Sequence, residues 1–253
     1  MKEENKAEAK MLFKKLFLVR KCIKCREPLD VTDFDSAFCP KCREGYLSAK
    51  MAICPDCSLE ASECKCRPRL LEKDDILALR RLFFYSKERA SEPQNKLIYF
   101  IKANRSRRVS GFVAREIYPL IRSELSKAED CVDRVPLVVT IPRSHSSLMR
   151  YGFDQSELIA RELSKIYGFE HCDALKRRSG SSQKRLTAGE RRKNIKALVS
   201  VNTKKADVIR GRTVILLDDV VTTGASMSAC AGLLYDKGAK NILCIAIASD
   251  IKS

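Results

Sequence analysis

The stretch VILLDDVVTTGAS at residues 214–226 places the strongest limit on how this chain can fold. Its opening apolar residues predict a buried strand, and the residues after Gly224 have the pattern of a helix that ends at Gly238. A strand that turns directly into a helix is the building unit of a parallel sheet covered by helices on both faces. Asp218 and Asp219 at the end of that strand would repel each other and lose hydration, so they indicate a site that receives a ligand.

Other segments of the chain repeat this alternation of strand and helix. Apolar and β-branched runs predict strands at residues 83–85, 135–141, 213–217 and 241–248. Helical spacing predicts helices that start at Pro93 and Val109, the second with Pro119 as a point for a kink or a break. A third helix begins with the capping box at residues 154–157, and a fourth covers residues 226–237. The pattern predicts an α/β fold in which a parallel sheet is flanked by helices.

Positive charge is high and unevenly placed along the 253 residues. The formal net charge is +17, and residues 174–212 contain 13 Lys or Arg side chains against Glu190 and Asp207. This concentration favours an anion-binding surface or a basic loop, but charge alone does not separate nucleic acid, anionic lipid and small polyphosphates as partners. A hydrophobic content of 45% is typical of a globular chain with a core, which argues against disorder.

No run of 18 apolar residues is present, so the sequence predicts no transmembrane segment. The first residues are acidic and are followed by only a broken apolar stretch, which does not resemble a secretory signal. We expect an N-terminal helical extension over residues 1–20 and a cytoplasmic protein. The amphipathic character of this extension leaves a peripheral position at the inner face of the membrane as the alternative.

Eight of the 12 cysteines precede residue 67 and fall into four close pairs. In a reducing compartment, Cys-x-x-Cys pairs indicate metal ligands rather than disulfides. Four thiolates complete a closed tetrahedral shell around Zn²⁺, and metal binding would supply the folding free energy that a segment with few apolar residues lacks. We therefore expect a cysteine-rich zinc-binding module at residues 21–67 that holds one or two structural zinc ions.

The simplest pairing of these cysteines gives two sites in sequence order. The first site would use Cys22, Cys25, Cys39 and Cys42, and the second Cys54, Cys57, Cys64 and Cys66. An interleaved pairing is the alternative, and the spacing of Cys64 and Cys66 is shorter than usual. Cys230 and Cys244 stand alone in apolar patterns that suit small buried side chains. With only two histidines in the chain, a catalytic cysteine is disfavoured.

The turn after the acidic pair has the composition of a phosphate site. A helix N-terminus and the backbone N–H groups of a turn attract an anion, and Thr222, Thr223 and Ser226 add hydroxyl donors. The aspartates would repel a phosphate, but they can accept hydrogen bonds from sugar hydroxyls or help to hold Mg²⁺ through water. A phosphate beside a diol describes a ribose 5-phosphate, and no Walker A pattern supports an ordinary P-loop instead.

The whole stretch VILLDDVVTTGAS resembles the phosphoribosyl-pyrophosphate (PRPP) motif of type I phosphoribosyltransferases. The resemblance implies that Asp218 and Asp219 are catalytic residues that contact the ribose hydroxyls. It also implies that the turn binds the 5′-phosphate through Thr222, Thr223, Gly224, Ala225 and Ser226. The implied architecture is a type I phosphoribosyltransferase fold over residues 75–253, with PRPP as the ligand and Mg²⁺ bound with it.

A cysteine-rich N-terminus ahead of this domain resembles the ComF family, the competence proteins linked to natural transformation and DNA uptake, with a double zinc-ribbon-like module. Three further stretches carry the resemblance: LIYFIKANRSRRVSGFVAREI, IPRSHSSLMRYGFDQSELIA and LKRRSGSSQKRLTAGERRKNI. Tyr151 and Asp154 depart from the arginine and asparagine of the family pattern. The resemblance implies further contacts with PRPP or phosphate from Lys102, Arg143, Arg177 and Arg191.

The resemblance implies a ComF-type protein that handles single-stranded DNA during uptake and has a PRPP or nucleotide site. The alternative is an active phosphoribosyltransferase in which a nitrogen acceptor displaces pyrophosphate from C1 of PRPP, with a basic loop at residues 176–193 closing over the leaving group. A basic surface suits contacts with DNA phosphates. The zinc module could dock a helicase or another part of the uptake machinery. No stretch identifies a nucleobase pocket.

Overall fold

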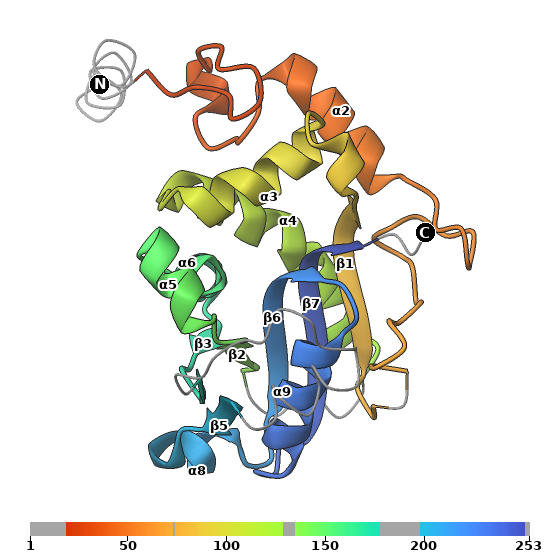
Figure 1. The fold of residues 1–253 in the computed structure, drawn as a ribbon, viewed down its shortest axis with the longest axis vertical. Coiled ribbons are helices and arrows are strands. Elements are labelled where there is room, and N and C mark those ends of the chain that lie inside the picture. The colour runs from red at the N-terminus through yellow and green to blue at the C-terminus, as the bar shows by residue number, and fades with distance from the viewer. Residues whose placement is uncertain (1–18, 73, 129–134, 178–197, 251–253) are drawn as a thin grey trace, which may run out of the picture.

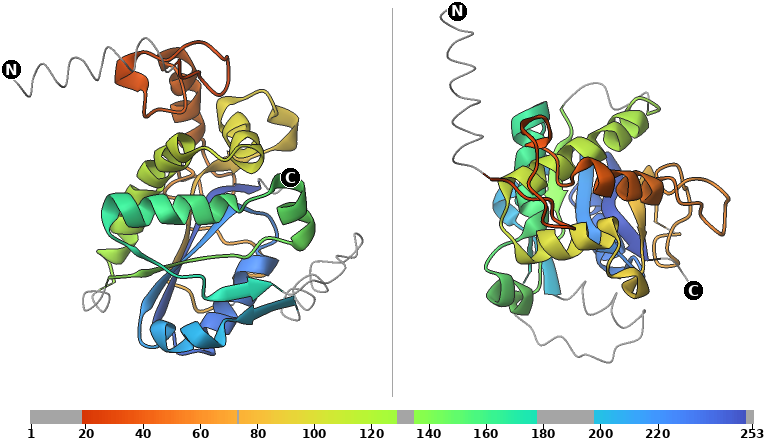
Figure 2. Two further views of the ribbon diagram at one scale, coloured as in Figure 1. Left: turned by 90° about the vertical axis from the view of Figure 1, so that its left-hand side faces the viewer. Right: turned by 90° about the horizontal axis from the view of Figure 1, so that it is seen from above.

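A parallel sheet forms the centre of the structure, a computed structural model that describes residues 19–72, 74–128, 135–177 and 198–250. The strand order is β1-β7-β6-β2-β3, with helices on both faces (Figures 1 and 2). All neighbouring strands in this sheet run parallel. A separate antiparallel pair consists of β4 (Leu175–Arg177) and β5 (Val199–Val201). The predicted α/β fold with a parallel sheet is confirmed.

Three of the sheet strands, β1, β6 and β7, are longer than predicted. The strands are β1 (Ala78–Tyr85), β2 (Leu137–Thr140), β3 (Glu170–His171), β6 (Thr213–Val221) and β7 (Asn241–Asp250). β6 continues through both aspartates and pairs with β7 as far as Val221, whereas only residues 213–217 were expected. β1 begins at Ala78 rather than residue 83, because Arg80 and Arg81 interrupt the apolar pattern there.

The helices follow most of the sequence signals. They are α2 (Pro40–Lys50), α3 (Pro93–Ala103), α4 (Arg107–Leu125), α5 (His145–Tyr151), α6 (Gln155–Tyr167), α8 (Ala206–Ile209) and α9 (Ala225–Tyr235), with 3-10 turns at Val31–Asp33, Lys87–Arg89 and Thr203–Lys205. α4 contains Pro119 and still runs unbroken. Asp154 caps α6 by accepting hydrogen bonds from the backbone N–H groups of Ser156 and Glu157, as the capping box predicts. α9 follows Gly224 directly and ends at Tyr235, two residues before the expected end.

The central strands place alternate side chains in two apolar layers. Ile215 and Leu217 pack in the layer that contains residues of α3, α4 and α6. Val214 and Leu216 point the other way, into the layer formed with α9. Strands of a parallel sheet are buried on both faces, which explains why β6 reads as an unbroken apolar run. The run stops at Asp218, so polar side chains begin at the carboxyl end of the sheet.

The two knuckles that begin at Cys22 and Cys54 share one backbone structure. In each, the N–H of the first cysteine donates to the carbonyl five residues later, and the residue four positions on donates back to the carbonyl of that cysteine. That fourth residue, Arg26 in one knuckle and Ser58 in the other, has a positive φ. A β-bridge closes both loops. The N-terminal module is therefore built from one local structure used twice, with α2 between the copies.

Some expectations fall on parts of the chain for which no structure is described. The N-terminal extension lies almost entirely outside the described residues, as do Arg191 and most of the basic loop expected at residues 176–193. Among the residues that are described, no helix has both the length and the hydropathy that crossing a membrane requires.

Candidate functional site

The acidic pair lies at the carboxyl end of β6, next to the start of α9. Asp219 is buried, with 8% of its surface exposed, and Asp218 is half-buried. The Oδ1 of Asp218 accepts a hydrogen bond from the backbone N–H of Asp219 at 2.8 Å. Burial, together with the neighbouring carboxylate of Asp219, raises the pKa of Asp218 well above its ordinary value. A cation or a hydroxyl donor placed here would relieve that unfavourable charge.

Asp219 is held by side chains from two helices that are distant in the sequence. Lys102, in the last turn of α3, places its Nζ 3.2 Å from Oδ2 of Asp219. Gln155, the first residue of α6, donates a hydrogen bond from its Nε2 to the same oxygen. The Oδ1 of Asp219 accepts from the backbone N–H of Val220 at 2.6 Å. Asp219 is thus oriented before any ligand arrives.

Gln155 leaves one polar atom unused at this site. The side chain is 3% exposed, and its Oε1 has no hydrogen-bond partner among the described residues. Because the amide must present its N–H group to the carboxylate of Asp219, Oε1 is an open acceptor. Buried polar atoms are nearly always paired, so this almost inaccessible Oε1 would gain a partner if ligand binding moved a hydroxyl donor within its reach. A ribose hydroxyl has the required chemistry.

A cavity of about 600 Å³ opens over the acidic pair. It lies at the ends of β2 and β6, where ligands of open parallel sheets collect. Both aspartates line this cavity. The basic and hydroxyl side chains that line it are Lys102, Arg143, Ser144, Ser146, Ser147, Arg150, Arg177 and Ser226. The combination of cationic walls and an acidic floor suits a ligand that carries both phosphate and hydroxyl groups.

The turn between β6 and α9 encloses a second, smaller cavity of about 160 Å³. Thr222, Thr223, Gly224, Ala225 and Ser226 all line it. Asp218 and Ser226 line both cavities, so the two adjoin. Gly224 has φ +76° and is the residue before the first turn of the 11-residue helix α9. The turn therefore offers backbone N–H groups and hydroxyls to an anion next to the carboxylates.

Tyr151 stands where the family pattern has arginine, yet the cavity keeps positively charged side chains around it. The guanidinium carbons of Arg143 and Arg150 lie 5.2 Å and 5.3 Å from the centroid of the Tyr151 ring. Arg143 also donates to the carbonyl of Phe153 at 3.2 Å. Arg150 is a cavity residue that the sequence reasoning missed, although it lies beside the position where arginine was expected. Asp154, the second departure, acts as the helix cap, and burial raises its pKa.

The structure brings together most of the predicted ligand-binding residues. Asp218, Asp219, Lys102, Arg143, Arg177 and Ser226 line one cavity, and the remaining turn residues line the adjoining one. Arg191 lies outside the described residues. Gln155 is the main omission, since the capping box was read for its helix signal and not for the side chain that follows Asp154.

The eight N-terminal cysteines form two clusters in the order of the sequence. Cys22, Cys25, Cys39 and Cys42 make the first tetrad, and Cys54, Cys57, Cys64 and Cys66 the second, with all Sγ atoms of a tetrad within 4.8 Å of one another. The simplest pairing therefore agrees with the structure, and the interleaved one does not.

The spacing of the thiols fits a tetrahedral metal ion. A zinc shell with Zn–S bonds of about 2.3 Å places neighbouring sulfurs about 3.8 Å apart. The Sγ atoms of Cys25 and Cys39 are 3.6 Å apart, those of Cys54 and Cys66 3.9 Å, and those of Cys57 and Cys64 3.6 Å. Burial raises the pKa of Cys64 to about 11 and that of Cys66 to about 12, so a metal ion would displace protons from these thiols. The tetrads can bind zinc.

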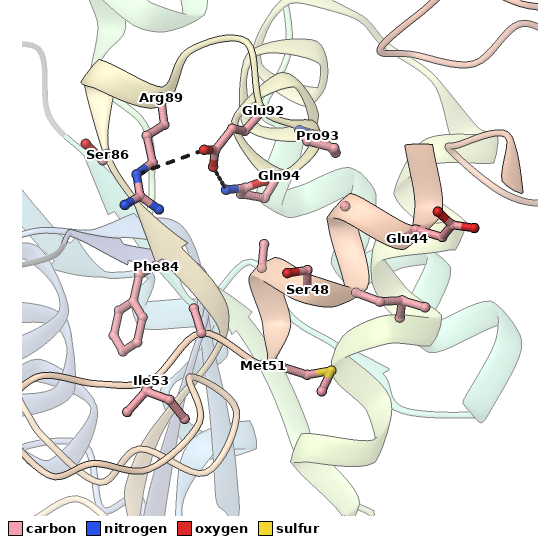
Figure 3. Close-up of a pocket in the computed structure, with 14 residues that line it drawn as sticks. Glu44, Ser48, Met51, Ile53, Phe84, Ser86, Arg89, Glu92, Pro93 and Gln94 are labelled. Atoms are coloured by element: carbon pink, nitrogen blue, oxygen red, sulfur yellow. Dashed lines mark hydrogen bonds and ion pairs between the residues drawn. The ribbon is translucent and has the colours of Figure 1, made fainter. Parts of the chain in front are cut away.

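A larger cavity, of about 900 Å³, lies elsewhere, between α2 and the start of α3. Figure 3 shows Met51, Ile53 and Phe84 on its walls, with Glu92 bonded to Gln94 and paired with Arg89 at one end. None of the predicted ligand-binding residues line it. Its apolar walls and acidic groups do not suit a phosphate, so the smaller cavity over the acidic pair is the candidate site.

Comparison with known proteins agrees with this geometry. Residues 152–253 match the family model described as the phosphoribosyl transferase domain. The DNA utilization protein YhgH of Escherichia coli O157:H7 is 28% identical over 229 residues, which cover 87% of this chain and 93% of that protein. The competence protein ComFC of Streptococcus pneumoniae is 25% identical over 82% of this chain and 86% of its own length.

A further relative, competence protein F of Haemophilus influenzae, is 27% identical over 60% of this chain and 66% of its own length. The matched family region contains β6, the acidic pair, the turn at residues 222–226 and α9. The chain thus carries a phosphoribosyl transferase domain at residues 152–253, and its homologues are competence protein F, ComFC and the DNA utilization proteins.

Proposed function

We propose that the cavity over the acidic pair binds the ribose 5-phosphate part of PRPP or of a related nucleotide. The observation that carries this proposal is the position of Asp218 and Asp219 directly beside the turn at residues 222–226, in two cavities that adjoin. The carboxylates would accept hydrogen bonds from the ribose hydroxyls, and the turn would surround the 5′-phosphate. Mg²⁺ would be bound together with PRPP, where the raised pKa of Asp218 indicates uncompensated negative charge.

The proposed phosphoribosyltransferase-like unit spans residues 75–253, beyond the region that the family model matches. Its support is the pairing of β1 with β7, which makes residues near 80 part of the same sheet as the acidic pair. Lys102, which also precedes the matched region, reaches Asp219. The proposed zinc-binding module spans residues 21–67 and would hold one ion in each tetrad.

We further propose that the protein acts in natural transformation by handling single-stranded DNA. The names of its homologues, which refer to competence and to DNA utilization, support this role. A net charge of +17 suits sequence-independent contacts with DNA phosphates. A helicase partner and a position at the inner membrane face remain predictions from the sequence.

An active phosphoribosyltransferase is the second candidate, and the basic walls of the cavity favour it. A nitrogen acceptor would form a bond to C1 of PRPP while the bond from C1 to the pyrophosphate oxygen breaks, and the acceptor would then lose a proton. Lys102, Arg143, Arg150 and Arg177 line the space where pyrophosphate charge would develop. Pyrophosphate release over a panel of nucleobases and amines tests this candidate.

Calorimetric titration of the zinc-loaded protein with PRPP and Mg²⁺ tests the ribose-phosphate site. The wild type should bind, and the double variant Asp218→Asn/Asp219→Asn should lose most of the affinity, because neutral amides accept weaker hydrogen bonds than carboxylates. Absence of binding to the wild type would rule out the site. Absence of single-stranded DNA binding at low salt would rule out the DNA-handling role separately.

A further inference from the structure

We infer that the second cysteine tetrad supports the turn at residues 222–226, hereafter the phosphate turn. A metal ion bound in this tetrad would then set the affinity of the phosphate turn for a ribose phosphate. The inference rests on the proposed function and adds two positioning residues to it, Leu71 and Arg81. It concerns only the tetrad of Cys54, Cys57, Cys64 and Cys66, hereafter the second tetrad. The first tetrad, which includes Cys22 and Cys42, packs against the main core and serves as an internal control.

The chain that leaves the second tetrad packs directly against the phosphate turn. A Cβ placed at Gly224 would lie 2.9 Å from Cδ1 of Leu71 and 3.3 Å from Cβ of Pro68. Leu71 is fully buried, and it follows Cys66, the last ligand of the tetrad, by five residues. Arg67 fixes the same segment by donating to the carbonyl of Ile76 at 2.9 Å. The turn thus rests on a short segment that is anchored at one end by a metal ligand.

Arg81 makes a second connection between the tetrad and the turn. It lies on β1 and is 4% exposed. One guanidinium nitrogen donates to the carbonyl of Cys66, and the other donates to Oγ of Ser249 at 3.0 Å. Ser249 pairs in the sheet with Val221, the residue immediately before Thr222. Figure 1 shows the orange loops that follow α2, which carry the second tetrad, beside the upper ends of β1 and β7.

The tetrad and the turn also face a common small cavity. Cys54, Cys66, Arg81, Thr222 and Ser249 are among its lining residues, and its volume is about 40 Å³. A zinc ion with four thiolates carries a net negative charge, which the buried guanidinium of Arg81 would offset. The second tetrad is therefore connected to the turn by the packing of Leu71 and, through Arg81 and Ser249, to the strand that leads into the turn.

Metal should matter more at the second tetrad than at the first because the second has little apolar support. Its core cluster consists of Cys54, Ala61, Cys64 and Phe84. Cys22 and Cys42 of the first tetrad belong instead to the main core, with Phe38, Tyr46 and Phe112. A segment without a sufficient core depends on metal binding for its structure, so loss of the ion should loosen residues 54–71.

Ribose 5-phosphate binding to the full-length protein tests the inference, with zinc content measured in the same samples. Cys57→Ser should lose one zinc ion and bind ribose 5-phosphate about tenfold more weakly. Cys25→Ser, in the first tetrad, should lose one zinc ion and keep its affinity within about twofold. Linkage requires the reverse effect as well, so saturating ribose 5-phosphate should slow removal of zinc from the second tetrad by a chelator.

Leu71→Ala separates the mechanical connection from the metal and remains informative where a cysteine variant unfolds. It keeps all eight ligands and should bind two zinc ions, yet the space left under Gly224 should weaken ribose 5-phosphate binding about tenfold. Leu59→Ala is its matched control, because Leu59 lies in the knuckle that begins at Cys54 and this leucine is 41% exposed. Its affinity should equal that of the wild type.

The outcomes distinguish this inference from the proposed function. If the zinc-loaded wild type fails to bind ribose 5-phosphate, the ribose-phosphate site itself is refuted, and the inference with it. If the wild type binds and Cys57→Ser and Leu71→Ala bind equally well, only the inference is overturned. Equal weakening by Cys25→Ser and Cys57→Ser would also overturn it, because that result indicates a general loss of structure.

Discussion

Single residues at the end of β6 are arranged for a ligand at some cost in stability. The pKa of Asp218 is raised because the carboxyl group is buried and lies beside Asp219, so its charged form is unfavourable in the folded protein. A carboxyl group whose pKa is raised on folding stabilises the fold in acid, and the stabilisation is lost as the pH rises through the folded-state pKa. Substituting the acid by its amide removes this penalty.

Asp218→Asn should therefore stabilise the protein while it weakens ribose-phosphate binding. We expect an increase of about 1 kcal/mol in the free energy of unfolding at neutral pH, as is common when a functional residue is neutralised. The difference from wild type should grow as the pH rises above about 4, the pKa of an unfolded Asp, and level off once Asp218 ionises in the folded state. Urea denaturation across a pH series measures this, and a constant difference would contradict the assignment.

Gln155→Leu tests whether the open acceptor of this side chain serves the ligand. The change removes the donor to Asp219 and the unused Oε1, so ribose 5-phosphate should bind about tenfold more weakly, the equivalent of a hydrogen bond to a charged group. Gln94→Leu is a matched control, since Gln94 is also buried and also has an Oε1 without a partner in the described part of the chain. It lines the other cavity, so its loss should leave the affinity unchanged.

At the scale of secondary structure elements, the turn into α9 combines a positive φ with a close contact. Gly224→Ala would strain a backbone at φ +76° and press a methyl group against Leu71. Gly168→Ala is the control, because Gly168 has φ +74° and nothing within 4 Å of the added Cβ. The strain alone should lower the free energy of unfolding by about 1 kcal/mol. The Gly224 variant should lose more and also bind ribose 5-phosphate more weakly, as denaturation and calorimetry would show.

Elements whose signals are local were predictable, and those that depend on distant partners were not. The apolar runs of β2, β6 and β7 and the cap at Asp154 carry their own evidence. The first residues of β1 were not predicted as strand, because the charged Arg80 and Arg81 interrupt the apolar pattern. Both are buried because they donate to the carbonyls of Cys64 and Cys66, which lie elsewhere in the sequence. α2 was not predicted, because Cys39 at its N-cap and Cys42 in its first turn indicated a metal knuckle and not a helix.

The candidate site follows the same division. The acidic pair and its turn are contiguous in the sequence, so their chemistry could be inferred from spacing alone. Gln155 reaches Asp219 from 64 residues earlier in the chain and Lys102 from farther back still, so no spacing reveals these contacts. A resemblance to a family supplied Lys102, and the unpaired atom of Gln155 became visible only in three dimensions.

At the scale of the whole molecule, the excess of positive charge predicts the salt dependence of DNA binding. Each phosphate contact with a single strand contributes about −0.7 to the slope of log affinity against log salt, so five contacts imply about a hundredfold loss between 50 and 200 mM. Asp218→Asn/Asp219→Asn should show the same slope, since it leaves the basic surface intact. Fluorescence anisotropy with a labelled oligonucleotide measures it, and an affinity independent of salt would contradict an electrostatic surface.

The pairing of β1 with β7 has a consequence for how the chain is made. β1 ends at Tyr85 and finds its only sheet neighbour among the described strands in residues 241–250. At ordinary rates of translation, about 10–30 s separate the synthesis of the two strands. During that interval Leu79, Leu82 and Phe83, all buried in the finished protein, have no strand to cover them. A nascent chain of this kind is a natural client for chaperones at the ribosome, and truncation before β7 should yield an aggregating product.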